Sequence, residues 1–227
     1  MKTWFITGAS RGFGALVVER ALKKGDRVVA TARNPQAVID RFGENPNLLA
    51  VALDVTDEGQ ATAAARAAVD RFGGIDILLN NAGFGLMGAV EETSAAEVET
   101  VFRTNVFGLL AVTRAVLPYM RERRSGHIIN ISSITGYSAV TGFGVYSATK
   151  FAVEGLSEAL HSELAPLGIH VTSVEPGFFR TDFLDASSLL VSPARIADYA
   201  ETAGKCALSR PRSATSSPAI PRNLPIF

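Results

Sequence analysis

The chain has 227 residues, and its charges balance, with 22 Lys and Arg residues against 22 Asp and Glu residues. This balance argues against nucleic acid or an anionic membrane as a partner, so we expect a small-molecule partner. The single cysteine, Cys206, excludes an internal disulfide and fits a reducing compartment. The N-terminal apolar run is too short for a signal peptide, and the longest apolar run, 106–117, is interrupted by Arg114 and falls short of a membrane span. We therefore expect a soluble cytoplasmic protein.

The first segment predicts a strand, a glycine-rich turn and a helix. The apolar run 3–7 leads directly into Gly8-Ala9-Ser10-Arg11-Gly12-Phe13-Gly14, and apolar residues at helical spacing follow over 15–22. Glycines allow the backbone to turn tightly and approach a pyrophosphate, which then binds the free N–H groups at the start of the helix. The spacing T-G-x-x-x-G-x-G differs from the three-glycine fingerprint of long-chain dehydrogenases.

Two other interpretations of this turn stay open. It could be a plain glycine-rich connection without a ligand. Residues 8–12 also fit the G-x-S-x-G elbow that exposes a nucleophilic serine, here Ser10. That elbow needs an oxyanion loop on an earlier strand, and no strand precedes this one. His161 and His170 follow in the chain, but without a convincing acidic partner.

The second predicted strand, 27–32, ends in Arg33 and indicates the cofactor. An NAD site would place an acidic residue near this strand end to bind the ribose hydroxyls, and none stands here. Arg33 can instead meet a 2′-phosphate, and Arg11 in the glycine turn could add a second positive charge. Either arginine could be a solvated surface residue, but together they favour NADP(H) over NAD.

The middle of the chain continues the alternation. Asn34-Pro35 opens a short helix that Gly43 ends, and a strand over 47–53 leads to Asp54, which could bind an adenine amino group or merely cap the next turn. A helix over about 57–72 precedes a strand over 75–79. The strand leads into Asn80-Asn81-Ala82-Gly83. The capping box 94–97 then opens a long helical region that reaches Arg124, with a bend near Gly108. Asn105 lies inside this region and is a poor helix former.

A fifth strand over 127–132 delivers Ser133, and a loop over 134–145 precedes a helix that begins at Tyr146. Tyr146 and Lys150 would share one face of that helix, about 6 Å apart along its axis. An ammonium at this distance can lower the pKa of a phenol, so the pair looks like a general acid/base with its tuning neighbour. Tyr-x-x-x-Lys alone is a weak signal. The three histidines show no metal-ligand spacing, and we expect no metal.

The sixth strand, 169–174, completes the pattern of one α/β domain over residues 1–208. We expect a single doubly wound, Rossmann-type parallel sheet with helices on both faces and with the last edge strand apparently missing. Residues 209–227 carry four prolines and several serines without helical or strand period, and predict an irregular Pro/Ser-rich tail.

Taken together, these motifs closely resemble the short-chain dehydrogenase/reductase family. The agreement lies in the glycine turn, in residues 80–83, and in Asn105, Ser133, Tyr146 with Lys150, Pro176-Gly177 and Thr181, all in the family's order and spacing. The resemblance covers residues 3 to about 184. It implies a cofactor site formed by Gly8, Ser10, Arg11, Gly12, Phe13, Gly14, Arg33, Asp54, Val55, Asn81, Ala82, Gly83, Tyr146, Lys150, Pro176, Gly177 and Thr181.

The resemblance also implies the catalytic roles. Tyr146 would give its proton to a substrate carbonyl oxygen while the nicotinamide hydride goes to the carbon, and Ser133 would hydrogen-bond the same oxygen. Lys150 would bind the nicotinamide ribose and lower the pKa of Tyr146. Asn105 would hold a water that links Lys150 to solvent, and Thr181 would hold the nicotinamide carboxamide. The function implied is NADP(H)-dependent interconversion of a carbonyl and a secondary alcohol.

The substrate and the assembly are predicted more coarsely. Apolar residues follow the strand ends that should line the pocket, so we expect a small apolar or aromatic alcohol or ketone. The pocket residues are Phe84, Leu86, Met87, Phe143, Phe178, Phe179, Phe183 and Leu184, although several could simply pack the core. In the family, the helix with Tyr146 and the long helix before it commonly pack against a second subunit, which implies a homodimer or homotetramer.

The atypical end leaves a second functional reading open. The family normally continues with another helix and a last edge strand, and neither is visible here, so we expect a truncated or frame-shifted end that bares the outer edge of the sixth strand. The alternative function is therefore a cofactor-binding but catalytically impaired member of the family. A sugar epimerase of the broader family fits less well, because its glycine spacing differs and its chain is usually longer.

Overall fold

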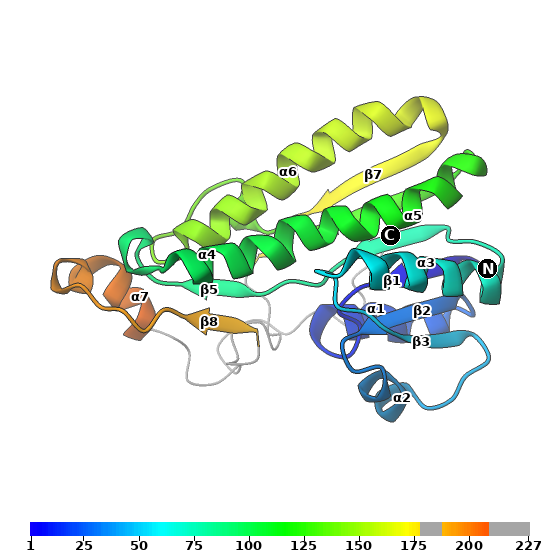
Figure 1. The fold of residues 1–227 in the computed structure, drawn as a ribbon, viewed down its shortest axis with the longest axis horizontal. Helices are drawn as coiled ribbons and strands as arrows, with labels where there is room; N and C mark the ends of the chain where they lie inside the picture. Colours follow the sequence, from blue (N-terminus) through cyan, green and yellow to red (C-terminus); the bar gives the residue numbers. More distant parts are fainter. Residues whose placement is uncertain (178–187, 209–227) are drawn as a thin grey trace.

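The computed structural model describes residues 1–177 and 188–208 and contains one six-stranded parallel sheet (Figure 1). The strands are β1 (Thr3–Ile6), β2 (Arg27–Ala32), β3 (Leu48–Ala52), β4 (Ile77–Asn80), β6 (Gly126–Ile131) and β7 (Ile169–Val174). Their order across the sheet is β3-β2-β1-β4-β6-β7, which confirms the predicted doubly wound sheet. Within the described residues, β7 forms one edge. Residues 209–227, the predicted tail, lie outside them.

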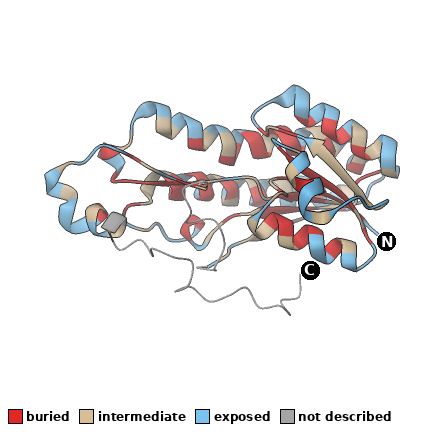
Figure 2. Ribbon diagram, turned by 90° about the horizontal axis from the view of Figure 1, so that it is seen from below, coloured by how far each residue is buried: buried red, intermediate tan, exposed pale blue. Residues whose placement is uncertain are grey.

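Helices cover both faces of this sheet, as predicted. On one face α1 (Gly12–Lys23) and α2 (Gln36–Phe42) pack on alternate strand residues such as Ile6 and Leu79. On the other face α3 (Glu58–Phe72), α5 (Leu109–Glu122) and α6 (Gly144–Leu164) share a core with the intervening residues. The period of two along each strand therefore divides the apolar residues between two cores. Figure 2 shows the buried residues along the sheet and on the inner faces of the helices.

The long helical region begins and bends where the sequence predicts. Ser94 Oγ accepts a hydrogen bond from Glu97 N (3.3 Å) and Glu97 Oε2 accepts one from Ser94 N (2.8 Å), so the capping box opens α4 (Ala95–Phe102). A π-helical turn, Arg103–Gly108, then joins α4 to α5. A Cβ on Gly108 would lie 2.7 Å from Val55 Cγ2, so only glycine lets this turn approach the end of β3.

The same helix, Ala95–Glu122, is long and apolar enough to cross a membrane by length and composition alone. Half of its most apolar window is buried inside the protein. The core helix of a folded domain meets the same criterion of length and composition.

A second, small sheet forms beyond the main one and was not predicted. β5 (Gly85–Met87) and β8 (Leu189–Val191) pair in parallel and lie side by side below α4 in Figure 1. The chain then forms a short 3₁₀ turn (Ala197–Tyr199), a π-helical turn (Ala200–Gly204) and α7 (Lys205–Leu208). The predicted loop 134–145 is also shorter than expected, because a 3₁₀ turn forms over Ile134–Gly136 and α6 already begins at Gly144.

Candidate active site

The turn between β1 and α1 has the geometry of an anion-binding cradle. Gly8 and Gly12 have positive φ values of 64° and 55°, which favour glycine. The side chain of the N-cap residue, Arg11, makes no capping hydrogen bond, and the first turn of α1 holds no acidic residue, so its backbone N–H groups and positive dipole end face the turn. Gly14 lies beneath the turn, where a Cβ would come within 2.5 Å of Gly8 O. These features fit a pyrophosphate.

A hydrogen-bond network fixes this turn to the end of β4. Thr7 Oγ1 accepts hydrogen bonds from the backbone N–H groups of Asn81 (2.9 Å) and Ala82 (3.0 Å). Asn81 Nδ2 donates to Thr7 O (2.9 Å) and to Gly8 O (3.1 Å). The predicted segment 81–83 therefore lies beside the glycine turn at the carboxyl ends of neighbouring strands, where an open α/β sheet binds its ligand.

A cavity of about 910 Å³ runs along this edge of the sheet. It brings together most of the predicted cofactor and catalytic residues, while Gly14 and Asn105 do not line it and Thr181 lies outside the described residues. Its lining includes Gly8, Ser10, Arg11, Gly12, Phe13, Arg33, Asp54, Val55, Asn81, Ala82, Gly83, Ser133, Tyr146, Lys150, Pro176 and Gly177. This shape and residue set fit a dinucleotide.

At one end of the cavity, Arg33 and Asp54 follow β2 and β3. Arg33 is exposed and lies on the cavity wall, where a 2′-phosphate could meet its guanidinium. Asp54 Oδ1 accepts hydrogen bonds from Thr56 N (3.0 Å) and Thr56 Oγ1 (2.7 Å). Of the two roles considered for Asp54, the structure thus shows the turn cap.

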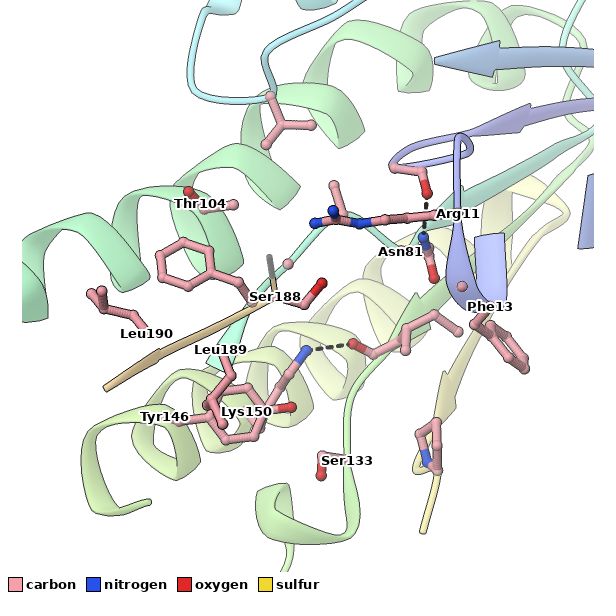
Figure 3. A pocket seen from close by; sticks show the side chains of 18 of the residues that line it. Arg11, Phe13, Asn81, Thr104, Ser133, Tyr146, Lys150, Ser188, Leu189 and Leu190 are labelled. Carbon is pink, nitrogen blue, oxygen red and sulfur yellow. Dashed lines mark hydrogen bonds between the residues drawn. The ribbon is translucent and has the colours of Figure 1, made fainter. Parts of the chain in front are cut away.

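At the other end, β6 delivers Ser133 and α6 delivers Tyr146 and Lys150 (Figure 3). Ser133 Oγ accepts hydrogen bonds from Thr135 N and Thr135 Oγ1, both at 3.1 Å. Ser133 also hydrogen-bonds the phenol oxygen of Tyr146, and because its oxygen accepts from Thr135, it donates its own proton to Tyr146. Lys150 Nζ donates to Ile131 O (2.8 Å) and lies 5.7 Å from the centroid of the Tyr146 ring.

Burial dominates the electrostatics of Tyr146 and Lys150. Burial raises the pKa of Tyr146 to about 12, and the hydrogen bond from Ser133 opposes that rise. Burial therefore dominates the phenol pKa in the protein alone, and the lowering of that pKa by Lys150 stays a prediction for the cofactor-bound protein. Burial also lowers the pKa of Lys150 to about 8, and the Glu154 carboxylate one turn along α6 opposes that change.

Asn105 lies in the π-helical turn and is 2% exposed. Its Oδ1 accepts a hydrogen bond from Phe84 N (3.1 Å), and its Nδ2 donates to Phe84 O (2.9 Å) and Thr149 Oγ1 (3.2 Å). A Cβ on Gly83 would lie 3.0 Å from Asn105 Oδ1 and 4.0 Å from Lys150 Nζ. Asn105 thus lies close to Lys150, but its side chain holds the backbone of Phe84, one of the cavity residues.

The apolar side of the cavity was predicted only in part. Phe84 and Phe143 line it, whereas Leu86 and Met87 are buried within β5, so their assignment to the pocket is wrong. Residues 178, 179, 183 and 184 lie outside the described residues. Lining residues that were not predicted from the sequence include Thr100, Arg103, Thr104, Ile134, Val140, Ser188, Leu189 and Leu190. The apolar triplet 189–191 between serines could have indicated a short strand.

The structure disfavours the other chemistries. None of the three histidines lines the cavity that Ser10 faces, so a serine nucleophile there would lack its base. Among the described residues, no group of three His, Cys, Asp or Glu side chains could hold a metal ion.

Comparisons with known proteins agree with this geometry. A family model described as short chain dehydrogenase matches residues 2–189. Oxidoreductase BOA17 of Botryotinia fuckeliana is 39% identical over 226 residues, which cover 98% of this chain and 81% of that protein. The 3-ketodihydrosphingosine reductase of Bacteroides thetaiotaomicron is 42% identical over 197 residues, which cover 87% of this chain and 71% of that protein.

Solved structures extend the agreement to the fold. A short-chain dehydrogenase from Streptomyces avermitilis has a TM-score of 0.84 at 43% identity, covering 92% of this chain and 78% of that one. ElxO with NADP bound has a TM-score of 0.76 at 34% identity, covering 80% and 75%. A short-chain dehydrogenase/reductase from Burkholderia phymatum in complex with NAD has a TM-score of 0.76 at 32% identity, covering 82% and 69%. Both dinucleotides therefore occur among similar structures.

Proposed function

Because the chain belongs to the short-chain dehydrogenase family, we propose that it is an oxidoreductase that interconverts a carbonyl compound and a secondary alcohol with NADP(H). The observation that carries this proposal is the position of Ser133, Tyr146 and Lys150. They line the same cavity as the glycine-rich turn between β1 and α1. Proton donor and dinucleotide site thus share one cavity, as hydride transfer to a carbonyl requires.

The chain's own residues divide the work as follows. Tyr146 holds a proton at neutral pH, because its pKa is about 12, and donates it from its phenol oxygen to the substrate carbonyl oxygen. Ser133 has a single hydroxyl proton, which it directs at the Tyr146 oxygen in the free protein and would donate to the substrate oxygen, orienting it, when a carbonyl compound binds. Lys150, buried beside the ring, supplies positive charge and binds the nicotinamide ribose. When bound, NADPH supplies the hydride. A phenol that stays protonated suits carbonyl reduction.

NADPH rather than NADH is proposed because Arg33 lies where β2 ends, on the cavity wall, and no acidic residue follows that strand. A bidentate guanidinium is suited to a phosphate group. We expect wild-type protein to bind NADPH at least about tenfold more tightly than NADH, and Arg33→Ala to abolish this difference. Equal affinity of the wild type for both would overturn the assignment.

Turnover is tested with NADPH and a panel of apolar and aromatic ketones. Tyr146→Phe removes the proton donor and should lower kcat by about 10²–10⁴-fold, while NADPH still binds. Tyr137→Phe is the matched control, since Tyr137 is 82% exposed and should tolerate the change. Full activity of Tyr146→Phe would refute the role of Tyr146. NADPH binding without reduction of any carbonyl would support the alternative, a cofactor-binding but catalytically impaired chain.

Three coarser proposals accompany this one. The apolar lining residues Phe84, Phe143 and Leu189 favour a small apolar or aromatic substrate, and faster turnover of polar sugars would argue against it. Phe107 and Phe151 are about half exposed on the π-helical turn and on α6, which favours a homodimer or homotetramer, testable by light scattering. A cytoplasmic location is consistent with the single cysteine.

A further inference from the structure

A buried carboxylate, Glu92, has no part in the proposed chemistry. It lies at the end of the 3₁₀ turn Val90–Glu92 that follows β5, and it is 5% exposed. Its Oε2 accepts a hydrogen bond from Ala89 N (2.9 Å), and its Oε1 accepts one from Ile196 N (2.9 Å). These two donors belong to segments more than a hundred residues apart in the chain. The carboxylate therefore bridges the segment after β5 to the segment after β8.

Ser192 forms a second bridge between the same segments. It follows β8 and is fully buried, its Oγ donates to Glu92 O (2.7 Å), and its N–H donates to Met87 O (2.9 Å). Tyr199 adds a third, outer link, because its hydroxyl donates to Glu91 Oε2 (2.7 Å). The links all join the chain after residue 188 to the stretch 85–92.

The strand that these links hold is a wall of the cavity. Ser188, Leu189 and Leu190 line the cavity, and Figure 3 shows Leu189 above Tyr146, with Leu190 farther along the same strand. Leu189 is 3% exposed, whereas Leu190 is 39% exposed. A carbonyl substrate that reaches Tyr146 must therefore lie against β8. The position of β8 sets the shape of the space it enters.

A ribbon of two three-residue strands is not stable by itself. Charge-assisted hydrogen bonds to a carboxylate are about twice as strong as neutral ones. An amide at position 92 could present its single oxygen to only one of the two N–H donors, and its NH₂ group would face the other. The site therefore requires a carboxylate rather than any polar side chain of that size.

We propose that Glu92 is a positioning residue for the substrate: by tying β8 to β5, it fixes the wall of the cavity opposite Tyr146 without contacting substrate or cofactor. This proposal rests on the proposed function. The cofactor cradle between β1 and β4 is built from other segments, so loss of the Glu92 links affects substrate binding and leaves NADPH binding intact.

The test compares Glu92→Gln with Glu163→Gln, a charge-matched control at an exposed site near the end of α6. In the full chain, Glu92→Gln should raise the KM for the carbonyl substrate about tenfold while kcat falls less than about threefold. The NADPH dissociation constant should stay within about twofold, and the control should match the wild type. Backbone amides of Gly85 and Ser192, which pair β5 with β8, should exchange hydrogen about tenfold faster in the variant.

Ser192→Ala provides a second variant if Glu92→Gln does not fold, and it should shift KM and exchange in the same direction. Unchanged KM in a variant whose ribbon amides exchange faster would overturn the positioning role, and so would unchanged exchange. If the wild type showed no turnover, the proposed function would be refuted. If the amides of Gly85 and Ser192 still exchanged faster in Glu92→Gln, the link that Glu92 forms between β5 and β8 would stand. The two failures are therefore distinguishable.

Discussion

Replacing Gly14 by alanine should damage the cofactor cradle more than any neighbouring glycine substitution. A Cβ at this position would lie 2.5 Å from Gly8 O and 2.6 Å from Asn81 Nδ2, well inside van der Waals contact. Neither group can move freely, because Asn81 Nδ2 already donates to Thr7 O and Gly8 O. The added methyl group must therefore displace the turn or break a hydrogen bond that joins β1 to β4.

The structure allows a rough magnitude. Inserting a methyl group into a packed site typically costs about 1–3 kcal/mol, and losing one hydrogen bond costs about 0.5–1.5 kcal/mol. We expect Gly14→Ala to lower the free energy of unfolding by about 2–4 kcal/mol. Because the displaced groups form the anion cradle, NADPH affinity should also fall by tenfold or more, that is by at least about 1.4 kcal/mol.

Two other glycines separate this effect from those of backbone conformation and helix propensity. Gly12 has a φ of 55° and no atom within 4 Å of an added Cβ, so alanine there should cost only the left-handed strain, about 1–2 kcal/mol. Gly155 is helical and equally open, so alanine there should stabilise the protein by about 0.5–1 kcal/mol. Urea unfolding and NADPH fluorescence titration measure both quantities. The reasoning is refuted if Gly14→Ala unfolds and binds NADPH like the wild type.

Two further predictions concern the buried polar residues. Burial lowers the pKa of Lys150 to about 8, so the folded chain loses this proton at a lower pH than the unfolded chain. The free-energy cost of burying the charged ammonium is therefore fully present below pH 8 and is relieved as the pH rises. The free energy of unfolding of the wild type, measured relative to Lys150→Met, should increase between about pH 7 and about pH 9.5. The slope of this increase should approach about 1.4 kcal/mol per pH unit above about pH 8. A difference between the two proteins that does not depend on pH would contradict the burial argument. Asn105→Ala should lower the free energy of unfolding by about 2–4 kcal/mol, since it removes three hydrogen bonds and leaves the Phe84 backbone without its partners. An unfolding curve like that of the wild type would show that this contact contributes little.

The features that could be predicted from sequence are those encoded by local patterns. Apolar periodicity placed six strands within a few residues of their observed bounds, and the capping box at Ser94 marked the start of α4. The glycine turn and the segment 81–83 could be assigned to one cavity because both follow parallel strands, and such strand ends meet at one edge.

What could not be predicted depends on long-range contacts. β5 and β8 are three residues long and about a hundred residues apart, so neither has a period to detect, and each forms only because the other is present. The pKa of Tyr146 depends on how deeply the phenol is buried, and helical spacing from Lys150 does not reveal this. For Asn105, an unfavourable position in a helix indicated a role, but its contact with Phe84 required the fold.

The two ends of the cavity differ in how closely their segments approach each other, and this difference has a functional consequence. The cofactor end is fixed by hydrogen bonds between the side chains of Thr7 and Asn81 and the backbone, and by the close approach of Gly8 and Gly14 to Asn81 and Ala82, where an added Cβ disturbs the cradle. The wall opposite Tyr146 is a small ribbon held by a few side-chain hydrogen bonds at Glu92 and Ser192. Hydride and proton transfer require fixed geometry, whereas substrate choice requires a wall whose side chains can be exchanged without disturbing that geometry. Substitutions of Leu190 should therefore change which carbonyl compounds are reduced while leaving NADPH binding intact.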